Sequence, residues 1–374
     1  MATEGPRDHC VLMKRPKRRS TLIPEAGTQL EKLLSSDPWT QFPVRCCRCI
    51  DRAPFPHQTT PQRSAVSRPL FLALTFLPLI SLFAQDPSAP AARSLIIHSD
   101  DAGMSHSVNR ATIAAMETGL VTSCSIMVPC PWFPEFAEWA RQHPEMDFGI
   151  HLTLNSEFQS YRWGPVAGRD KVPTLVDANG YLHRNKEDVR NMARPVEVEI
   201  ELKAQIDRAL KAGIRLSHLD THMGTVVSTS EMLEIYVRLG LEYNLPVMIM
   251  RHPEPELAPD YPDLFSKNLQ YIQLLQAQSL PVIDYLFQYY DGKTHEQRLQ
   301  RYLETFQNLK PGVSQMIIHC GIDDSELQAI TGSHFVRGND TRIFSDADVR
   351  RQIEGMGIEL VSWTQLRERQ LRDR

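Results

Sequence analysis

Short aliphatic runs alternate with longer amphipathic stretches from about residue 90 onward, and this order restricts the fold more than any other feature of the sequence. The amphipathic stretches, such as "VNRATIAAMETG" and "HEQRLQRYLETFQNL", have apolar residues at helical spacing, and several end in glycine. The aliphatic runs predict strands at Leu95–His98, Ser123–Val128, Asp147–Leu152, Leu216–Asp220, Val247–Met250, Val282–Tyr285, Gln315–His319 and Ile358–Val361.

Alternating strands and helices of these lengths are typical of a parallel sheet covered by helices. We therefore predict an α/β fold, a (β/α) barrel that is either complete or a distorted, incomplete TIM-like barrel. A doubly wound open sheet would produce the same alternation and is the alternative.

The first part of the chain has a different character. Residues 1–68 contain 12 Lys and Arg against 6 Asp and Glu, with scattered proline and no apolar period. Cys46, Cys47 and Cys49 suggest a zinc site, but no second Cys/His pair stands at finger spacing. We interpret this part as a non-globular segment, or as a leader assigned by mistake, with translation starting near Val66.

Residues 69–84 resemble a secretory signal peptide. A basic residue, Arg68, precedes an apolar run too short to span a bilayer comfortably, and a polar Pro/Ala stretch follows. This pattern predicts export to the periplasm or the extracellular space, whether the segment is cleaved or kept as an anchor, with membrane contact only there. Residues 85–374 are then predicted to form a single catalytic barrel domain.

The charge of the chain excludes some partners. Beyond residue 68 the chain has 29 Lys and Arg against 39 Asp and Glu, which argues against nucleic acid because such a partner requires a basic surface patch. Cys124, Cys130 and Cys320 are too few, and odd in number, for a disulfide framework. The oligomeric state stays open, with a dimer among the options.

Acidic and imidazole side chains stand at the ends of four of the predicted strands. Asp100 and Asp101 stand at the end of the first, His151 of the third, His222 of the fourth and His319 of the seventh. Because the carboxyl ends of parallel strands meet on one face, we expect these groups to lie together. Two His and one carboxylate commonly bind a catalytic divalent metal, so Asp101, His151 and His222 are the predicted ligands.

The two remaining groups suit acid–base chemistry. A cation bound by Asp101 would offset the repulsion between the adjacent carboxylates and leave Asp100 as the general base, with His319 as the acid. This ligand set suits zinc, while magnesium and other divalent ions stay open. His98 and His218 are predicted to pack or to support the site, and Asp220 to orient a ligand or cap a loop.

The region from Leu154 to Arg194 is rich in Gly, Pro and Asn and predicts a long loop over the strand ends. Its aromatic residues could stack on sugar rings or belong to the core: Tyr161, Trp163 and Tyr181. Arg251, at the end of the fifth predicted strand, is either a substrate-binding group or a surface charge.

The motifs "SDDAG", "GIHLTL", "DTH" and "HCG" occur in this order, and the chain from about Leu95 to Leu366 resembles the carbohydrate deacetylases of the YdjC or ChbG type. The resemblance implies a distorted (β/α) barrel that binds one divalent metal and removes N-acetyl groups from amino sugars such as chitin-type oligosaccharides. By motif, Asp101, His151 and His222 would be ligands, Asp100 the base and His319 the acid. The substrate would be a small N-acetylated carbohydrate.

The chain departs from the family pattern at two positions. Met223 and Gly224 follow "DTH", where many members have a further histidine, and Cys320 stands where members have proline. Three other functions stay open: a metal-dependent phosphoesterase, a sugar isomerase and a sugar-binding protein without activity. A phosphoesterase would require more basic residues or a second metal, an isomerase more carboxylates, and a binding protein no aspartate pair.

Overall fold

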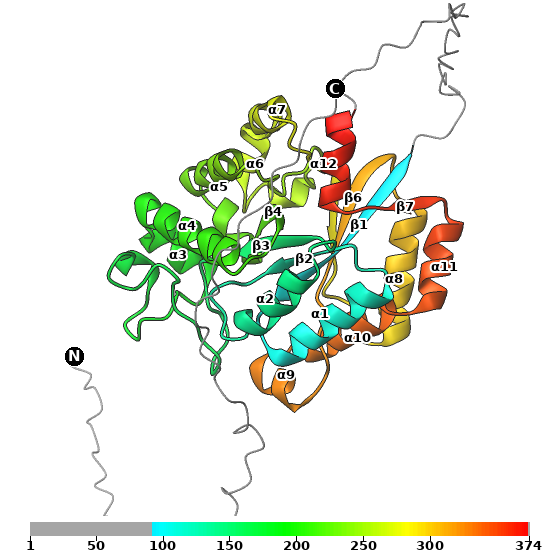
Figure 1. Cartoon of the computed structure of the whole chain (residues 1–374), viewed down its shortest axis with the longest axis horizontal. Helices are drawn as coiled ribbons and strands as arrows, with labels where there is room; N and C mark the ends of the chain where they lie inside the picture. Colours follow the sequence, from blue (N-terminus) through cyan, green and yellow to red (C-terminus); the bar gives the residue numbers. More distant parts are fainter. Residues whose placement is uncertain (1–91, 373–374) are drawn as a thin grey trace, which may run out of the picture. The chain divides into compact units, whose positions relative to one another are not determined.

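The apolar run at Leu95 forms the central strand of a parallel sheet (Figure 1). The computed structural model describes residues 92–372. Its strands are β1 (Arg93–Ala102), β2 (Ser123–Ile126), β3 (Phe148–Leu152), β4 (Leu216–Thr221), β5 (Tyr285–Gln288), β6 (Gly312–Ile318) and β7 (Ile358–Leu360). Their order is β4-β3-β2-β1-β6-β5, with β7 paired to the start of β1, and every pairing between these strands is parallel.

Single bridges continue the sheet beyond β4. Leu219 pairs with Val247, and Met250 pairs with Ile283 just before β5. The strands therefore form a ring, a distorted (β/α) barrel, which confirms the predicted fold class. The predicted strand at Val247–Met250 is reduced to these bridges because its few residues change partner from β4 to the segment before β5. The strand predicted at Val282–Tyr285 begins three residues later, at Tyr285.

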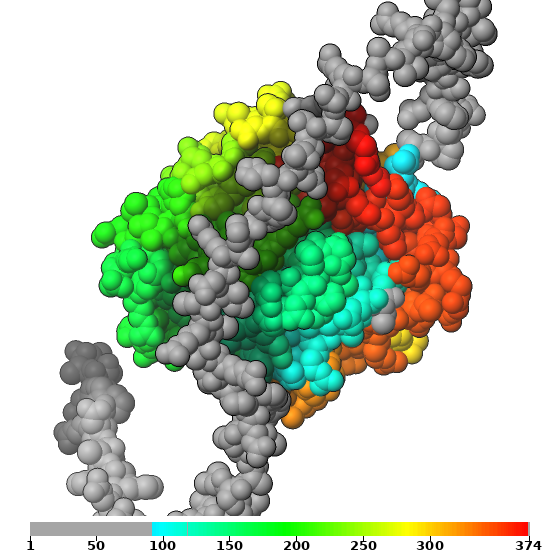
Figure 2. Space-filling view, viewed as in Figure 1, coloured from blue at the N-terminus to red at the C-terminus, as the bar shows by residue number. Residues whose placement is uncertain are grey.

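Helices cover the outside of this ring (Figure 1). The α-helices are α1 (His106–Thr118), α2 (Phe133–Gln142), α3 (Lys186–Met192), α4 (Pro195–Lys211), α5 (Ser230–Tyr243), α6 (Pro262–Ser266), α7 (Asn268–Ala277), α8 (His295–Gln307), α9 (Ser325–Ile330), α10 (His334–Phe344), α11 (Ala347–Gly355) and α12 (Trp363–Arg372). Three short 3₁₀ helices are η1 (Pro173–Leu175), η2 (His222–Val227) and η3 (Pro255–Leu257). Figure 2 shows the orange and red C-terminal residues lying directly against the cyan residues of β1 and α1.

The alternation of side chains along β1 separates two apolar cores. Leu95 and Ile97 belong to the large core, which also includes residues of the surrounding helices, whereas Ile96 belongs to a small cluster with Ile283 and Trp363. Since side chains in a strand alternate between faces, His98 and Asp100 follow Ile96 along the same side of β1. One face of this strand thus carries an apolar, an imidazole and a carboxyl side chain in succession.

Several predictions concern residues that the structure does not describe. The boundaries at residues 68 and 84, the signal-like segment 69–84 and the three clustered cysteines all lie outside the described residues. Within residues 92–372, no helix is both long enough and apolar enough to cross a membrane. We correct the prediction of export accordingly, because it rested on residues 69–84 alone and no described helix offers a membrane anchor.

A substitution at Gly149 tests the packing inside the barrel. A Cβ atom at this position of β3 would overlap the imidazole ring of His218 on β4. We expect Gly149→Ala to lower the free energy of unfolding by ~1–3 kcal/mol through overpacking, measured by urea denaturation. Gly355→Ala is the control, since a Cβ there has no neighbour within 4 Å. Equal stability of the two variants would contradict the described contact between β3 and His218.

Candidate active site

Both carboxyl groups of the Asp100–Asp101 pair line one cavity, although consecutive side chains of a regular strand point to opposite faces. The pairing of β1 with β2 shifts register between Ser99 and Ala102, as in a β-bulge, and Asp101 has a left-handed φ of 69°. Aspartate tolerates this conformation better than most residues, and bulges commonly redirect side chains near active sites. The local backbone thus explains how two adjacent acids share one site.

The cavity has a volume of about 520 Å³. All five predicted site residues line it: Asp100, Asp101, His151, His222 and His319. They come from the ends of β1, β3, β4 and β6, as expected for a parallel barrel.

Asp101, His151 and His222 have the spacing of metal ligands. The Oδ1 atom of Asp101 lies 3.4 Å from Nε2 of His151 and 3.3 Å from Nδ1 of His222. This oxygen is buried and has no hydrogen-bond partner. Two bonds of ~2.0–2.1 Å to one ion at a tetrahedral angle separate the ligand atoms by about 3.3 Å. The three residues therefore fit a metal ion.

The remaining polar atoms of these three side chains are held by other residues. Nδ1 of His151 contacts the Asp220 carboxylate, and Nε2 of His222 lies 3.1 Å from Glu157. Arg337, on α10, donates to Oδ2 of Asp101 at 2.6 Å. Histidines that bind metals commonly use their second ring nitrogen in this way, which fixes the ring orientation.

The charges around these residues favour positive charge at the site. Burial works against a charged imidazole, but Asp220 and Asp100 raise the pKa of His151 to about 9. Burial acts likewise on His222, where Glu157 and Asp101 raise the pKa to about 10. The surrounding carboxylates therefore stabilise a positive charge here, which either a protonated imidazole or a bound metal ion would supply.

Asp101 itself stays ionised. Burial opposes its ionisation, but the Arg337 guanidinium outweighs burial and holds the pKa of this carboxyl well below its usual range. Asp101 is therefore an anion at neutral pH, the state in which a carboxylate can bind a metal.

Asp100 differs from its neighbour. Burial raises the pKa of its carboxyl to about 7. Its Oδ2 atom lies 3.9 Å from Nε2 of His319, and its Oδ1 atom lies 3.3 Å from Nε2 of His98. A carboxyl group whose pKa is near the working pH is suited to accept and return a proton.

His319 is held from two sides. Its backbone N–H donates to Asp340 at 3.1 Å, and its Nε2 atom lies 3.3 Å from the hydroxyl of Tyr290. Burial and the nearby Arg337 lower the pKa of His319 to about 3. The imidazole is therefore neutral at rest.

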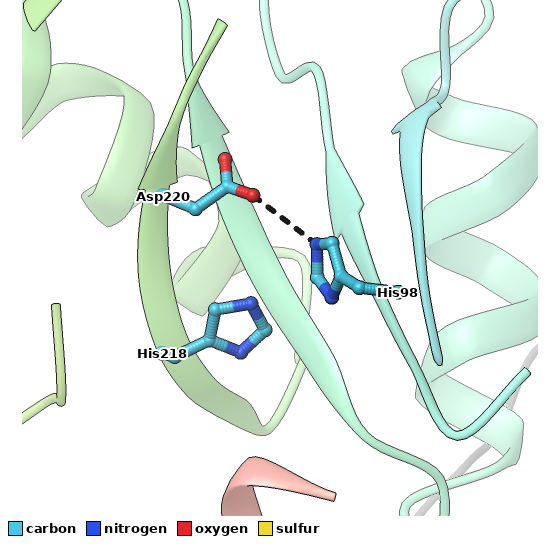
Figure 3. A group of neighbouring side chains, drawn as sticks. All are labelled: His98, His218 and Asp220. Atoms are coloured by element: carbon cyan, nitrogen blue, oxygen red, sulfur yellow. Dashed lines mark ion pairs between the residues drawn. The ribbon is translucent and has the colours of Figure 1, made fainter. Parts of the chain in front are cut away.

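A second group with metal-ligand spacing, formed by His98, His218 and Asp220, is buried (Figure 3). In it, Nε2 of His98 lies 3.1 Å from Oδ2 of Asp220, and His218 stacks on Trp363. None of His98, His218 and Asp220 lines the cavity, in contrast to Asp101 and its partners. Asp220 contacts both His98 and His151, so its carboxylate fixes the His151 ring.

The residues predicted either to contact substrate or to have a structural role, Tyr161, Trp163, Tyr181 and Arg251, do not line the cavity. Trp163 is buried and donates to the carbonyl of Asn155, and Arg251 is paired with Asp284 at 3.0 Å. The loop predicted for residues 154–194 folds in part as η1 and α3. Its Phe158 lines the cavity instead of Tyr161, Trp163 or Tyr181.

Sequence reasoning missed Glu157 and Arg337. Glu157 lies six residues after His151 without a motif of its own, and Arg337 lies on a helix 236 residues from its partner Asp101. No local pattern marks Arg337, although a buried anion pair requires a cation somewhere nearby.

The fold and the site together define a (β/α)-barrel protein with a candidate metal centre of two histidines and one aspartate. Residues 94–355 match the model of the family described as YdjC-like protein. The chain belongs to this family, which confirms the resemblance found in the sequence.

Three curated proteins named carbohydrate deacetylase illustrate the relationship. Those of Thermoanaerobacter pseudethanolicus and Brevibacillus brevis are 27% and 30% identical, each over 73% of this chain and 99% of the relative. That of Thermus thermophilus is 34% identical over 64% of this chain and 81% of the relative.

A solved structure supports the fold. The crystal structure of a protein from Enterococcus faecalis V583, described as a cellobiose-phosphate cleavage protein, has a TM-score of 0.62 and 28% identity. It covers 74% of this chain and 99% of its own.

Glu157 provides a test of the candidate metal centre. We expect Glu157→Gln to weaken binding of a divalent ion by ~10–100-fold, because His222 loses the carboxylate that orients its ring. Isothermal titration of the ion-free protein with Zn²⁺ measures this affinity. The matched control is Glu145→Gln, since Glu145 pairs with His143 at 3.1 Å on the surface. An unchanged affinity in Glu157→Gln would contradict the role of His222 as a ligand.

Proposed function

We propose that the protein is a metal-dependent carbohydrate deacetylase that hydrolyses the N-acetyl group of an amino sugar or its oligosaccharide. At the level of the enzyme class, the relatives confirm the prediction of a deacetylase. The observation that carries the finer proposal is the buried Oδ1 atom of Asp101, which has no hydrogen-bond partner and lies 3.4 and 3.3 Å from two imidazoles.

One divalent ion, zinc or magnesium, would be held by Asp101, His151 and His222. When bound, it would polarise the acetyl carbonyl as a Lewis acid. Arg337 holds the Asp101 carboxylate, Asp220 the His151 ring and Glu157 the His222 ring, so the ligands are oriented before substrate binds.

Asp100 would act as the general base. Its carboxylate removes one proton from the attacking water as the water oxygen forms a bond to the acetyl carbon. A pKa of about 7, raised by burial, leaves a substantial fraction of the carboxyl ionised at neutral pH and makes it a stronger base than an exposed aspartate.

His319 would protonate the leaving amine. Because burial and Arg337 lower its pKa to about 3, the ring begins neutral, and the proton that it delivers is the one taken up by Asp100. The Nε2 atom of His319 lies 3.9 Å from Asp100, a distance that a small movement closes. When the C–N bond breaks, the products are acetate and the free amine of the sugar.

Acetate release tests the proposed reaction. We expect the purified full chain to release acetate from N,N'-diacetylchitobiose or another N-acetylated sugar of a panel when Zn²⁺ or Mg²⁺ is supplied, and to stop after chelation. Restored ion should restore release. If no acetate forms with any ion although the folded protein binds one, the proposed deacetylation is wrong.

Replacing Asp100 separates the base from the metal ligands. We expect Asp100→Asn to lower kcat by ~10²–10⁴-fold because the general base is lost. Ion content, measured by mass spectrometry of the metal, should stay the same. Asp323→Asn is the control, since Asp323 pairs with His334 at 2.8 Å on the surface. Full activity of Asp100→Asn would contradict the role of Asp100 as the general base.

A further inference from the structure

One wall of the active-site cavity is mostly apolar, with Tyr261 and Gln288 as its polar side chains. It is formed by η2, by the segment from residue 248 to α6, and by β5. Its side chains include Met223, Met248, Met250, Leu257, Leu264 and Leu286. Sugar hydroxyls placed against this wall would lose their hydrogen bonds to water without replacement, which costs free energy for each group.

The charged side chains of the cavity lie at the metal centre, and among the described lining residues no lysine or arginine is free to pair with an anionic substrate. Among the described residues that line the cavity, the one Lys or Arg side chain is Arg337. Asp101 offsets its charge at 2.6 Å, and the carboxyl groups of Asp100 and Glu157 also line the cavity. A phosphorylated sugar would therefore find no unpaired lysine or arginine among the described residues that line the cavity.

We infer that the substrate carries an uncharged apolar group, a short alkyl chain or an aryl ring, that packs on the wall of Met223, Leu257 and Leu286 while its N-acyl group lies at Asp100. This inference rests on the proposed deacetylase function and adds the substrate class. The apolar group could be a substituent on the sugar or part of a longer acyl chain. The chemistry of the wall is the same for both.

The expected gain follows from burial of apolar surface. Each methylene that moves from water to the wall should raise kcat/KM or affinity by roughly fourfold. A cavity of about 520 Å³ lies within the usual size of ligand sites, roughly 300–1,000 Å³, and thus has room for a sugar and a short apolar group.

Two substrate series distinguish the sources of the apolar group. The first has methyl, propyl and hexyl β-glycosides of N-acetylglucosamine, and the second has N-acetyl, N-butyryl and N-hexanoyl forms of methyl glucosaminide. The full chain with its ion is assayed for the free amine, with the 6-phosphate of the methyl glycoside as a further substrate. We expect kcat/KM to rise by at least roughly tenfold along one series and to fall for the phosphate.

Leu257 provides the variant, because it is partly exposed and lies in the short η3 helix. Leu257→Ser should flatten the rise along the series. Leu269→Ser, an exposed leucine on α7 outside the cavity, should keep it. A rise that is identical in both variants would contradict the assigned wall.

The two proposals fail in different ways. If the N-acetyl methyl glycoside is deacetylated but neither series shows a rise, the apolar group is overturned and the deacetylase stands. If no substrate yields an amine, the deacetylase fails. Titration calorimetry with hexyl and methyl glucosaminide then decides the inference: tighter binding of the hexyl compound supports it, and equal affinity overturns it.

Discussion

Two adjacent carboxyl groups are buried at the end of the central strand. Their burial costs free energy, and the side chains around them offset that cost. Asp101 is stabilised as an anion by Arg337 at 2.6 Å, whereas burial raises the pKa of Asp100 to about 7. Burying a charge is tolerated only when it is paired and hydrogen-bonded. The two acids thus differ in protonation because their surroundings differ, and this difference suits them to the proposed roles of ligand and base.

The barrel delivers these groups through the two-residue period of its strands. On β1, Ile96, His98 and Asp100 follow one another on the same side of the strand. On β4, His218 and Asp220 likewise share a side, and His222 follows this strand as the first residue of η2. The small apolar cluster that contains Ile96 and Trp363 supports these strands. The buried His98 and Asp220 connect this cluster to the site. Residues that stabilise the barrel and residues of the candidate site therefore occupy successive positions of the same strands.

Much of this arrangement could be predicted from local sequence. Asp100, His151 and His222 each stand near the end of an aliphatic run, and the carboxyl ends of parallel strands meet on one face, so these side chains are expected to lie together. The left-handed conformation of Asp101 and the pairing with Arg337 could not be predicted, because both depend on how distant segments meet. For the same reason the bridges of residues 247–250, which join the ring, read as an ordinary strand in the sequence.

The central claim is that one divalent ion binds between Asp101, His151 and His222. Anomalous X-ray diffraction from crystals grown with Zn²⁺ would test it most directly. We predict one strong peak within ~2.0–2.2 Å of Oδ1 of Asp101 and of one nitrogen of each imidazole. A peak among His98, His218 and Asp220 instead, or none in a folded and zinc-saturated protein, would contradict it.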